Sequence, residues 1–264
     1  GRWLDVPLAG ALDLELALAA AETQTARLDA AARGLDAAGV ALDRLDLNAT
    51  AAALFATPRL DVRATVAGLA SGGTTVERAE ATVAGDLERL DVTLDAAGAL
   101  PQPFELAGEG DVRLAGGTTA VTLTRLDGRL DDLPVRLAQP ARLELDGATM
   151  RLRGLDLELD TGRLEGDATL GPERIDGRLE LAGLRLERLA ALGLPPFTGA
   201  VAAEVTLAGT RRAPVVDGRV GLSALRPADS DGPPAAIDLD WRLGGGRLAA
   251  ALATDGFGEP ALGA

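Results

Sequence analysis

The side chains that most often act as general bases, nucleophiles or metal ligands are missing from this sequence. Its 264 residues include no histidine, cysteine, tyrosine or lysine. Ser71, Ser223 and Ser230 therefore have no imidazole or amine to activate them, and a zinc ion would find no nitrogen or sulfur ligands. Only carboxylates are left to do chemistry, so we expect no enzyme, no catalytic residues, no metal site and no cofactor.

Two short acidic motifs are the remaining candidates for chemistry. Asp160-Thr161-Gly162 matches the motif of aspartic proteases, in which two aspartates share one proton. The sequence has no second copy, so a turn at the end of a strand explains the motif better, and a carboxylate-only hydrolase is the least favoured hypothesis. Asp229-Ser230-Asp231-Gly232 resembles half of a calcium loop, but Pro227 stands where such a loop needs another acid.

The composition favours a large core of small and medium side chains and argues against a nucleic-acid partner. Hydrophobic residues make up 47% of the chain and aromatic residues only 2%. The formal net charge is −14, which would repel nucleic acid over most of the surface. No stretch approaches the roughly 18 consecutive apolar residues that a membrane helix needs, so any anchor would lie outside this sequence.

The dominant pattern is an alternation of apolar and charged residues. Such a period of two is typical of strands with one apolar and one charged face. We count roughly seventeen such strands. The clearest runs lie at residues 12–18, 60–62, 90–94, 121–123, 135–137, 143–145, 155–159, 179–181, 201–207 and 237–243.

Glycine, proline and Asp-Gly pairs separate these runs and are interpreted as turns. The phrase Leu126-Asp127-Gly128-Arg129-Leu130 has close copies at 175–179 and 216–220, which indicates a repetitive sheet. A Leu/Val-Ala-Gly ending recurs at Gly10, Gly68, Gly85, Gly108, Gly116, Gly183 and Gly209. We expect one short helix within 187–192 and a loop at 226–236, and we see no composition shift that divides the chain into domains.

Such a sheet carries more apolar surface than a soluble monomer leaves bare, which is usually about 300–600 Å² in one patch. A second sheet, closure of the sheet on itself, or a long apolar ligand would each cover it. Periodicity alone leaves these three alternatives open.

From Pro134 onward the sequence resembles the TamB family of translocation and assembly proteins, within the AsmA-like superfamily. The resemblance rests on an ordered series of phrases: 140–147, 155–159 and 162–166, then a helix-like insertion at 186–194, and finally Leu207-Ala208-Gly209-Thr210, Pro214 and 217–220. Residues 40 to 133 show the same series of sequence phrases less clearly.

The resemblance implies an all-β protein: a long, antiparallel, repetitive sheet curled into an open U-shaped groove (a β-taco), with at most one or two short helices, over residues 1–264 as one segment of a longer chain. It further implies a periplasmic location, with an inner-membrane anchor outside this segment. The implied function is to conduct phospholipid between membranes and to support the assembly and secretion of outer-membrane proteins. The implied partners are phospholipid acyl chains and, through other parts of the chain, an outer-membrane barrel.

The residues expected to face the lipid are apolar members of the alternating runs. They are Leu143, Leu145, Leu155, Leu157, Leu159, Leu179, Leu181, Val205, Leu207, Ile237, Leu239 and Trp241. Seventeen strands at about 4.8 Å spacing would extend roughly 80 Å, a useful length for crossing an aqueous gap. The alternative is a structural β-solenoid or adhesin-like passenger that fills its apolar interior with its own chain.

Overall fold

The computed structural model describes residues 9–20, 24–37, 39–54, 56–100, 102–189, 197–229 and 232–256. The chain divides into two compact units, Gly1–Asp131 and Asp132–Ala264. The described residues form seventeen strands and one helix. Almost every strand follows from the alternation of apolar and charged residues, because extended backbone points successive side chains to opposite faces.

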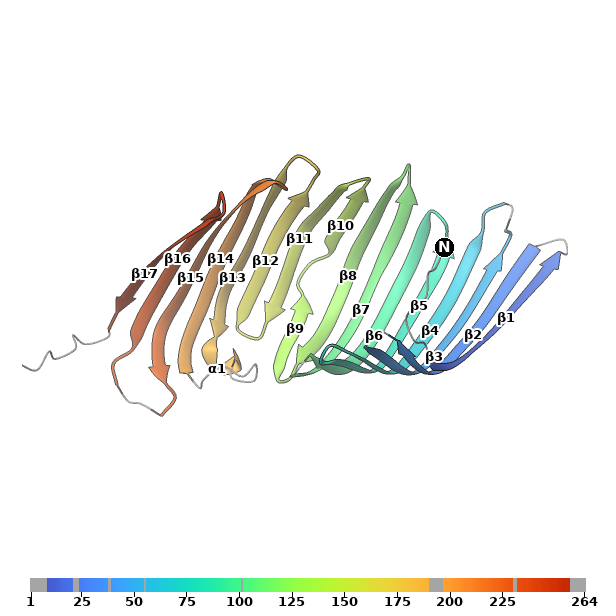
Figure 1. Ribbon diagram of the computed structural model, residues 1–264, viewed down its shortest axis with the longest axis horizontal. Helices are drawn as coiled ribbons and strands as arrows, with labels where there is room; N and C mark the ends of the chain where they lie inside the picture. The colour runs from blue at the N-terminus through green and yellow to red at the C-terminus, as the bar shows by residue number, and fades with distance from the viewer. Residues whose placement is uncertain are drawn as a thin grey trace, which may run out of the picture. The chain divides into compact units, whose positions relative to one another are not determined.

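The first unit is an antiparallel meander in which each strand pairs with the next one along the chain (Figure 1). Its strands are long, at 12 to 14 residues. They are β1 (Ala9–Ala20), β2 (Gln24–Ala37), β3 (Val40–Ala52), β4 (Arg59–Ser71), β5 (Thr74–Asp86), β6 (Arg89–Leu100), β7 (Gln102–Ala115) and β8 (Thr118–Leu130).

The second unit repeats the same design. Two short strands, β9 (Leu133–Leu137) and β10 (Ala141–Asp146), both pair with β11 (Thr149–Leu159). A meander then continues through the remaining strands. They are β12 (Gly162–Leu170), β13 (Ile175–Arg185), β14 (Phe197–Thr210), β15 (Ala213–Pro227), β16 (Ala235–Gly244) and β17 (Arg247–Asp255).

β-Bulges inside the long strands keep the apolar residues on one face. In β11 the register shifts between Leu152 and Leu155, around Gly154, whose φ is 67°. A bulge adds one residue to one strand of a pair, so the two leucines on either side of it point the same way although they are three positions apart. Gly183 in β13 and Ala224 in β15 do the same, with φ of 68° and 52°. Bulges also bend and twist a strand, which contributes to the curl of each sheet.

The single described helix, α1 (Leu186–Leu189), lies between β13 and β14 at the lower end of the strands in Figure 1. Leu186 packs with Leu133, Leu184 and Val201 in a buried cluster. Arg188 Nε donates to Asp160 Oδ2 at 2.8 Å, which fixes α1 to the β11–β12 turn. None of the described helices is long and apolar enough to cross a membrane.

The predicted fold class is confirmed: the protein is all-β, antiparallel and repetitive, each unit is a curled sheet, and the described residues include one short helix. The helix prediction is confirmed for its described part, while residues 190–192 lie outside the described residues. Asp160 and Thr161 form the turn between β11 and β12, as expected. The expected loop is shorter, because 226–227 belong to β15 and 235–236 to β16, and 230–231 lie outside the described residues.

The interpretation of Asp-Gly pairs and Leu/Val-Ala-Gly phrases as turns or strand endings is wrong at most positions. Gly128, Gly177 and Gly218 lie inside β8, β13 and β15. Gly68 and Gly183 are bulge or left-handed positions within a strand, with φ of 65° and 68°. Because the chain passes through these glycines without turning, the strands are longer than the apolar runs alone predict.

Candidate functional site

The apolar side chains of the second unit form continuous rows across its sheet. Directly paired residues on neighbouring antiparallel strands point to the same face. One row crosses from β9 to β17 through Leu137, Leu157, Leu164, Leu181, Ala203, Val220, Leu239 and Leu252. We call it the central row.

Two more rows run on the same face toward the upper hairpin turns of Figure 1. The glycine row comprises Leu155, Gly166, Leu179, Val205, Gly218, Trp241 and Ala250. The outer row comprises Leu143, Leu152, Ala168, Gly177, Leu207, Val216, Leu243 and Leu248. Leu145, Met150, Leu170 and Ile175 continue beyond the outer row at the ends of β10–β13.

All twelve residues proposed from the sequence to face a lipid lie on this one apolar face. Leu157, Leu181 and Leu239 are in the central row, and the glycine row contains four of the others: Leu155, Leu179, Val205 and Trp241. Leu143 and Leu207 are in the outer row, Leu145 lies beyond it, and Leu159 and Ile237 lie on the opposite side of the central row. The structure therefore brings the proposed residues together, and whether they contact lipid stays a prediction.

The two ends of this face differ in how well they are covered. Near α1, the leucines of the buried cluster are almost inaccessible, with Leu184 only 4% exposed, and Leu159, Leu181 and Leu222 pack against it. Toward the upper turns, Leu179 and Leu243 are 42% and 41% exposed. Within the described residues, the buried cluster therefore covers the end of the apolar face near α1, and the end near the upper turns is open.

A shallow hollow lies in the open part of the face. Its volume is about 170 Å³, and its apolar lining includes Leu152, Ala168, Leu179, Val205 and Leu207. Gly166 and Gly177, which have no side chains, also line it. An engineered apolar cavity of about 150 Å³ is large enough to bind benzene, so the hollow matches a short length of hydrocarbon.

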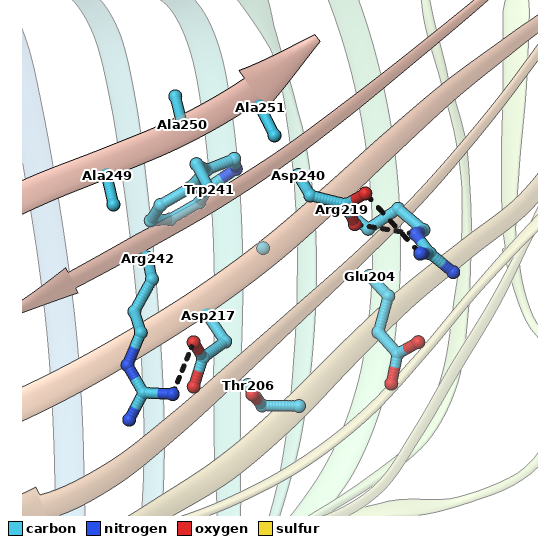
Figure 2. A pocket seen from close by; sticks show the side chains of 11 residues that line it. Glu204, Thr206, Asp217, Arg219, Asp240, Trp241, Arg242, Ala249, Ala250 and Ala251 are labelled. Carbon is cyan, nitrogen blue, oxygen red and sulfur yellow. Dashed lines mark hydrogen bonds and ion pairs between the residues drawn. The ribbon is translucent and has the colours of Figure 1, made fainter. Parts of the chain in front are cut away.

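The opposite face of the same strands is a lattice of ion pairs. Arg178 contacts Glu180 on its own strand and Glu204 on β14, at 2.9 and 3.0 Å. Arg219 Nε donates to Asp240 Oδ1 at 2.7 Å. Figure 2 shows this bond beside the ion pair of Arg242 with Asp217, which spans 3.5 Å. Exposed pairs of this kind are each worth only about 0–1 kcal/mol, so their main effect is to keep the face soluble and neutralise neighbouring carboxylates.

Asp156 is the one strongly buried member of this lattice, at 2% exposure. Arg163 binds it through two nitrogens, with Nε donating to Oδ1 at 2.7 Å. This hydrogen bond lowers the pKa of Asp156, an effect that burial opposes. A carboxylate held ionised by a paired guanidinium is a poor proton donor or acceptor near neutral pH, so its role here is structural.

Two larger cavities open on the charged faces. In the second unit one of about 470 Å³ lies among Thr206, Asp217, Arg219, Asp240 and Arg242, because Ala249 and Ala251 of β17 are too short to fill it (Figure 2). In the first unit one of about 1110 Å³ is lined by Arg27, Arg59 and Arg89 together with Asp61, Asp86 and Asp91. Each brings together charges of both signs. Among the described residues no cluster of three or more acids is arranged to hold a metal ion.

The first unit has an apolar face of the same kind, which the sequence-based site residues leave out. One of its rows crosses all eight strands through Leu16, Leu28, Ala49, Val62, Val83, Val92, Gly110 and Leu123. In the second unit the omitted members include Leu152, Leu164, Val216 and Leu243. The Leu-x-Gly-Leu phrase at 152–155 could have revealed Leu152, because a bulge at the glycine restores the same face after three residues.

The chain has no match among protein-family models, among curated proteins or among solved structures.

Proposed function

We propose that this chain is a lipid-carrying β-sheet segment of a translocation and assembly protein of the TamB kind. Its apolar face would shield phospholipid acyl chains from water while they pass between membranes. In this proposal the segment lies in the periplasm, is anchored to the inner membrane through another part of a longer chain, and supports the assembly and secretion of outer-membrane proteins with an outer-membrane barrel as partner.

The observation that carries the proposal is the extent of the open apolar face. Seven strands at about 4.8 Å and five residue rows at about 6.7 Å correspond to roughly 1,100 Å² for the whole apolar face of the second unit, including its covered end near α1. This exceeds the roughly 300–600 Å² of the largest apolar patch on an ordinary monomer. Leu179 lies inside this area and Leu243 lies near its upper margin, and both are still about two-fifths exposed, so covering the face would remove much apolar surface from water.

The bare face also favours a hydrocarbon over other apolar ligands. The rows consist mainly of leucine, valine, alanine and glycine. Thr254 lies on the last strand of the sheet, and apart from it the Trp241 indole is the only described side chain of the rows that can form a hydrogen bond. Binding would then come from burial, at about 0.8 kcal/mol for each methylene, with no fixed polar partner. A ligand held in this way can slide from row to row, which suits conduction.

A self-filled structural solenoid or adhesin-like passenger fits these observations less well. Such a protein would cover its apolar residues with its own coils, whereas in the second unit the described residues cover only the end near α1. The alternative predicts a lipid-free protein that binds no fatty acid.

Native mass spectrometry of the purified chain tests the proposal. We expect masses that correspond to bound phospholipid, which disappear on delipidation. A folded monomer that carries no lipid and takes up none from vesicles would contradict the proposal.

A pair of neighbouring substitutions makes the test specific to the apolar face. Leu207 and Thr206 are adjacent on β14 and point to opposite faces. Leu207→Glu should weaken the binding of a fluorescent fatty acid about thirtyfold, because losing the leucine and desolvating a carboxylate together cost about 2 kcal/mol. Thr206→Glu introduces the same charge on the charged face and should leave binding unchanged. Equal effects of the two variants would contradict the assignment of the face.

A further inference from the structure

The upper hairpin turns of the second unit carry arginines beside the open part of the apolar face. The β14–β15 turn is Arg211-Arg212, and Arg247 follows the β16–β17 turn of Gly245 and Gly246. Both turns lie at the end of the sheet opposite α1 (Figure 1). They are two strands apart, which is about 10 Å. We call these three residues the arginine rim.

The charges of the rim are largely unused within the described structure. Arg211 Nη2 donates to the carbonyl oxygen of Ala148 at 3.3 Å, which holds the side chain along the ends of the strands and leaves its other donors free. Arg212 and Arg247 make no side-chain ion pair or hydrogen bond to any described residue, in contrast to Arg178, Arg219 and Arg242 on the charged face.

Exposed apolar side chains flank the two turns that carry the rim. Leu243 and Leu248 flank the β16–β17 turn and are 41% and 69% exposed. They pair with each other in the outer row, which continues through Val216 and Leu207 on the strands that flank Arg211 and Arg212. Arg247 begins β17 one residue before Leu248 and therefore points to the charged face. The two turns that carry the rim nevertheless lie at the end of an apolar surface, an arrangement complementary to an amphiphile with an anionic head.

We propose that the arginine rim binds the phosphate of an anionic phospholipid whose acyl chain lies on the outer and glycine rows. The inference rests on the proposed function and adds selectivity to it: the apolar face accepts any acyl chain, while the rim prefers a net negative headgroup. Guanidinium groups bind phosphate with charge-assisted, often bidentate hydrogen bonds. The two turns of the rim contribute three arginines and no acid in a chain whose net charge is −14, and Glu173 is the acid of the neighbouring β12–β13 turn at the same end of the sheet. The rim is therefore a suitable place for an anion.

Trp241 provides a local probe for the experiment. It lies in the glycine row, two residues from Leu243, and the chain has only one other tryptophan, Trp3, which lies outside the described residues. In a Trp3→Phe background, lysophosphatidylglycerol and lysophosphatidylcholine with the same brominated acyl chain are titrated below their micelle-forming concentrations. Quenching of Trp241 fluorescence reports binding of the chain, and the ratio of the two dissociation constants reports headgroup selectivity.

The unsubstituted rim should bind the anionic lipid about tenfold more tightly than the zwitterionic one at low salt, since each arginine near an anionic headgroup adds electrostatic attraction. The combined variant Arg211→Gln, Arg212→Gln and Arg247→Gln should lose this preference and still bind both lipids. The matched control, Arg178→Gln, Arg219→Gln and Arg242→Gln, removes the same charge from the charged face and should retain the preference.

The possible failures are distinguishable. Equal affinity for the two lipids in the unsubstituted protein, or a preference that survives loss of the rim, overturns the rim proposal and leaves the acyl-chain function standing. Absence of quenching by either lipid overturns both proposals. Displacement of the lipid by inorganic phosphate at the same concentration, or binding to anionic vesicles but not to single lipids, contradicts a headgroup site for one phospholipid.

Discussion

Ala224 occupies a bulge position at which the other bulged strands of the unit have glycine, and replacing it with glycine should stabilise the protein. It occupies the bulge of β15 with φ of 52°, where β11 and β13 have Gly154 and Gly183 at 67° and 68°. The left-handed conformation costs a non-glycine residue about 1–2 kcal/mol. Glycine is in turn less favourable than alanine by roughly 0.5–1 kcal/mol because the unfolded chain has more freedom.

The difference predicts that Ala224→Gly raises the free energy of unfolding by about 0.5–1 kcal/mol. Urea denaturation followed by circular dichroism measures this change as a higher midpoint with an unchanged slope. Ala202→Gly is the matched control, because Ala202 is exposed within the neighbouring strand β14 and has no positive φ. The control should lose about 0.5–1 kcal/mol. Equal destabilisation by both substitutions would refute the assignment of position 224 as a strained bulge.

Three further predictions follow from individual contacts. Gly154→Ala should lower the free energy of unfolding by about 1–2 kcal/mol, through φ alone, because an added Cβ would meet only the Pro140 carbonyl at 3.5 Å; an unchanged midpoint in urea would contradict this. The pKa of Asp156 is lowered by the hydrogen bond from Arg163, so its stabilising effect is complete above the ordinary carboxyl pKa of about 3.9 and is lost as the pH falls through the lower folded-state value. The stability difference from Asp156→Asn should therefore shrink on acidification, and a difference that grows would count against the pair. Gly218→Val would overlap the Trp241 ring, so tryptophan emission should shift to longer wavelength as the ring is displaced, and an unchanged spectrum would place the ring elsewhere.

The alternation of apolar and charged residues is sufficient to predict that the strands exist and on which face of its strand each candidate lies. Leu157, Leu181 and Leu239 are far apart in the sequence, yet each occupies the inward phase of its own run, and antiparallel pairing joins them in one row. The phase is a local property of extended backbone, which explains why the sequence alone revealed it.

Strand lengths and the covered end of the face could not be predicted in the same way. A glycine such as Gly183 is equally compatible with a turn and with a bulge, and only pairing with a neighbouring strand decides between them. The plug formed by Leu133, Leu184 and Leu186 joins residues about fifty positions apart, and no periodicity in the sequence indicates that contact. The arginine rim has no signature in the sequence either, because its residues come from two turns that only the strand order brings to the same end of the sheet.

The central claim is that the open apolar face, and not the charged face, holds a lipid acyl chain. Benzoylphenylalanine placed at Leu179 or at Arg219 tests it most directly, since the two positions lie on opposite faces of the second unit. After irradiation with phospholipid, mass spectrometry should find lipid covalently attached at position 179 and none at position 219. Crosslinking at both positions equally, or at 219 alone, would contradict the account.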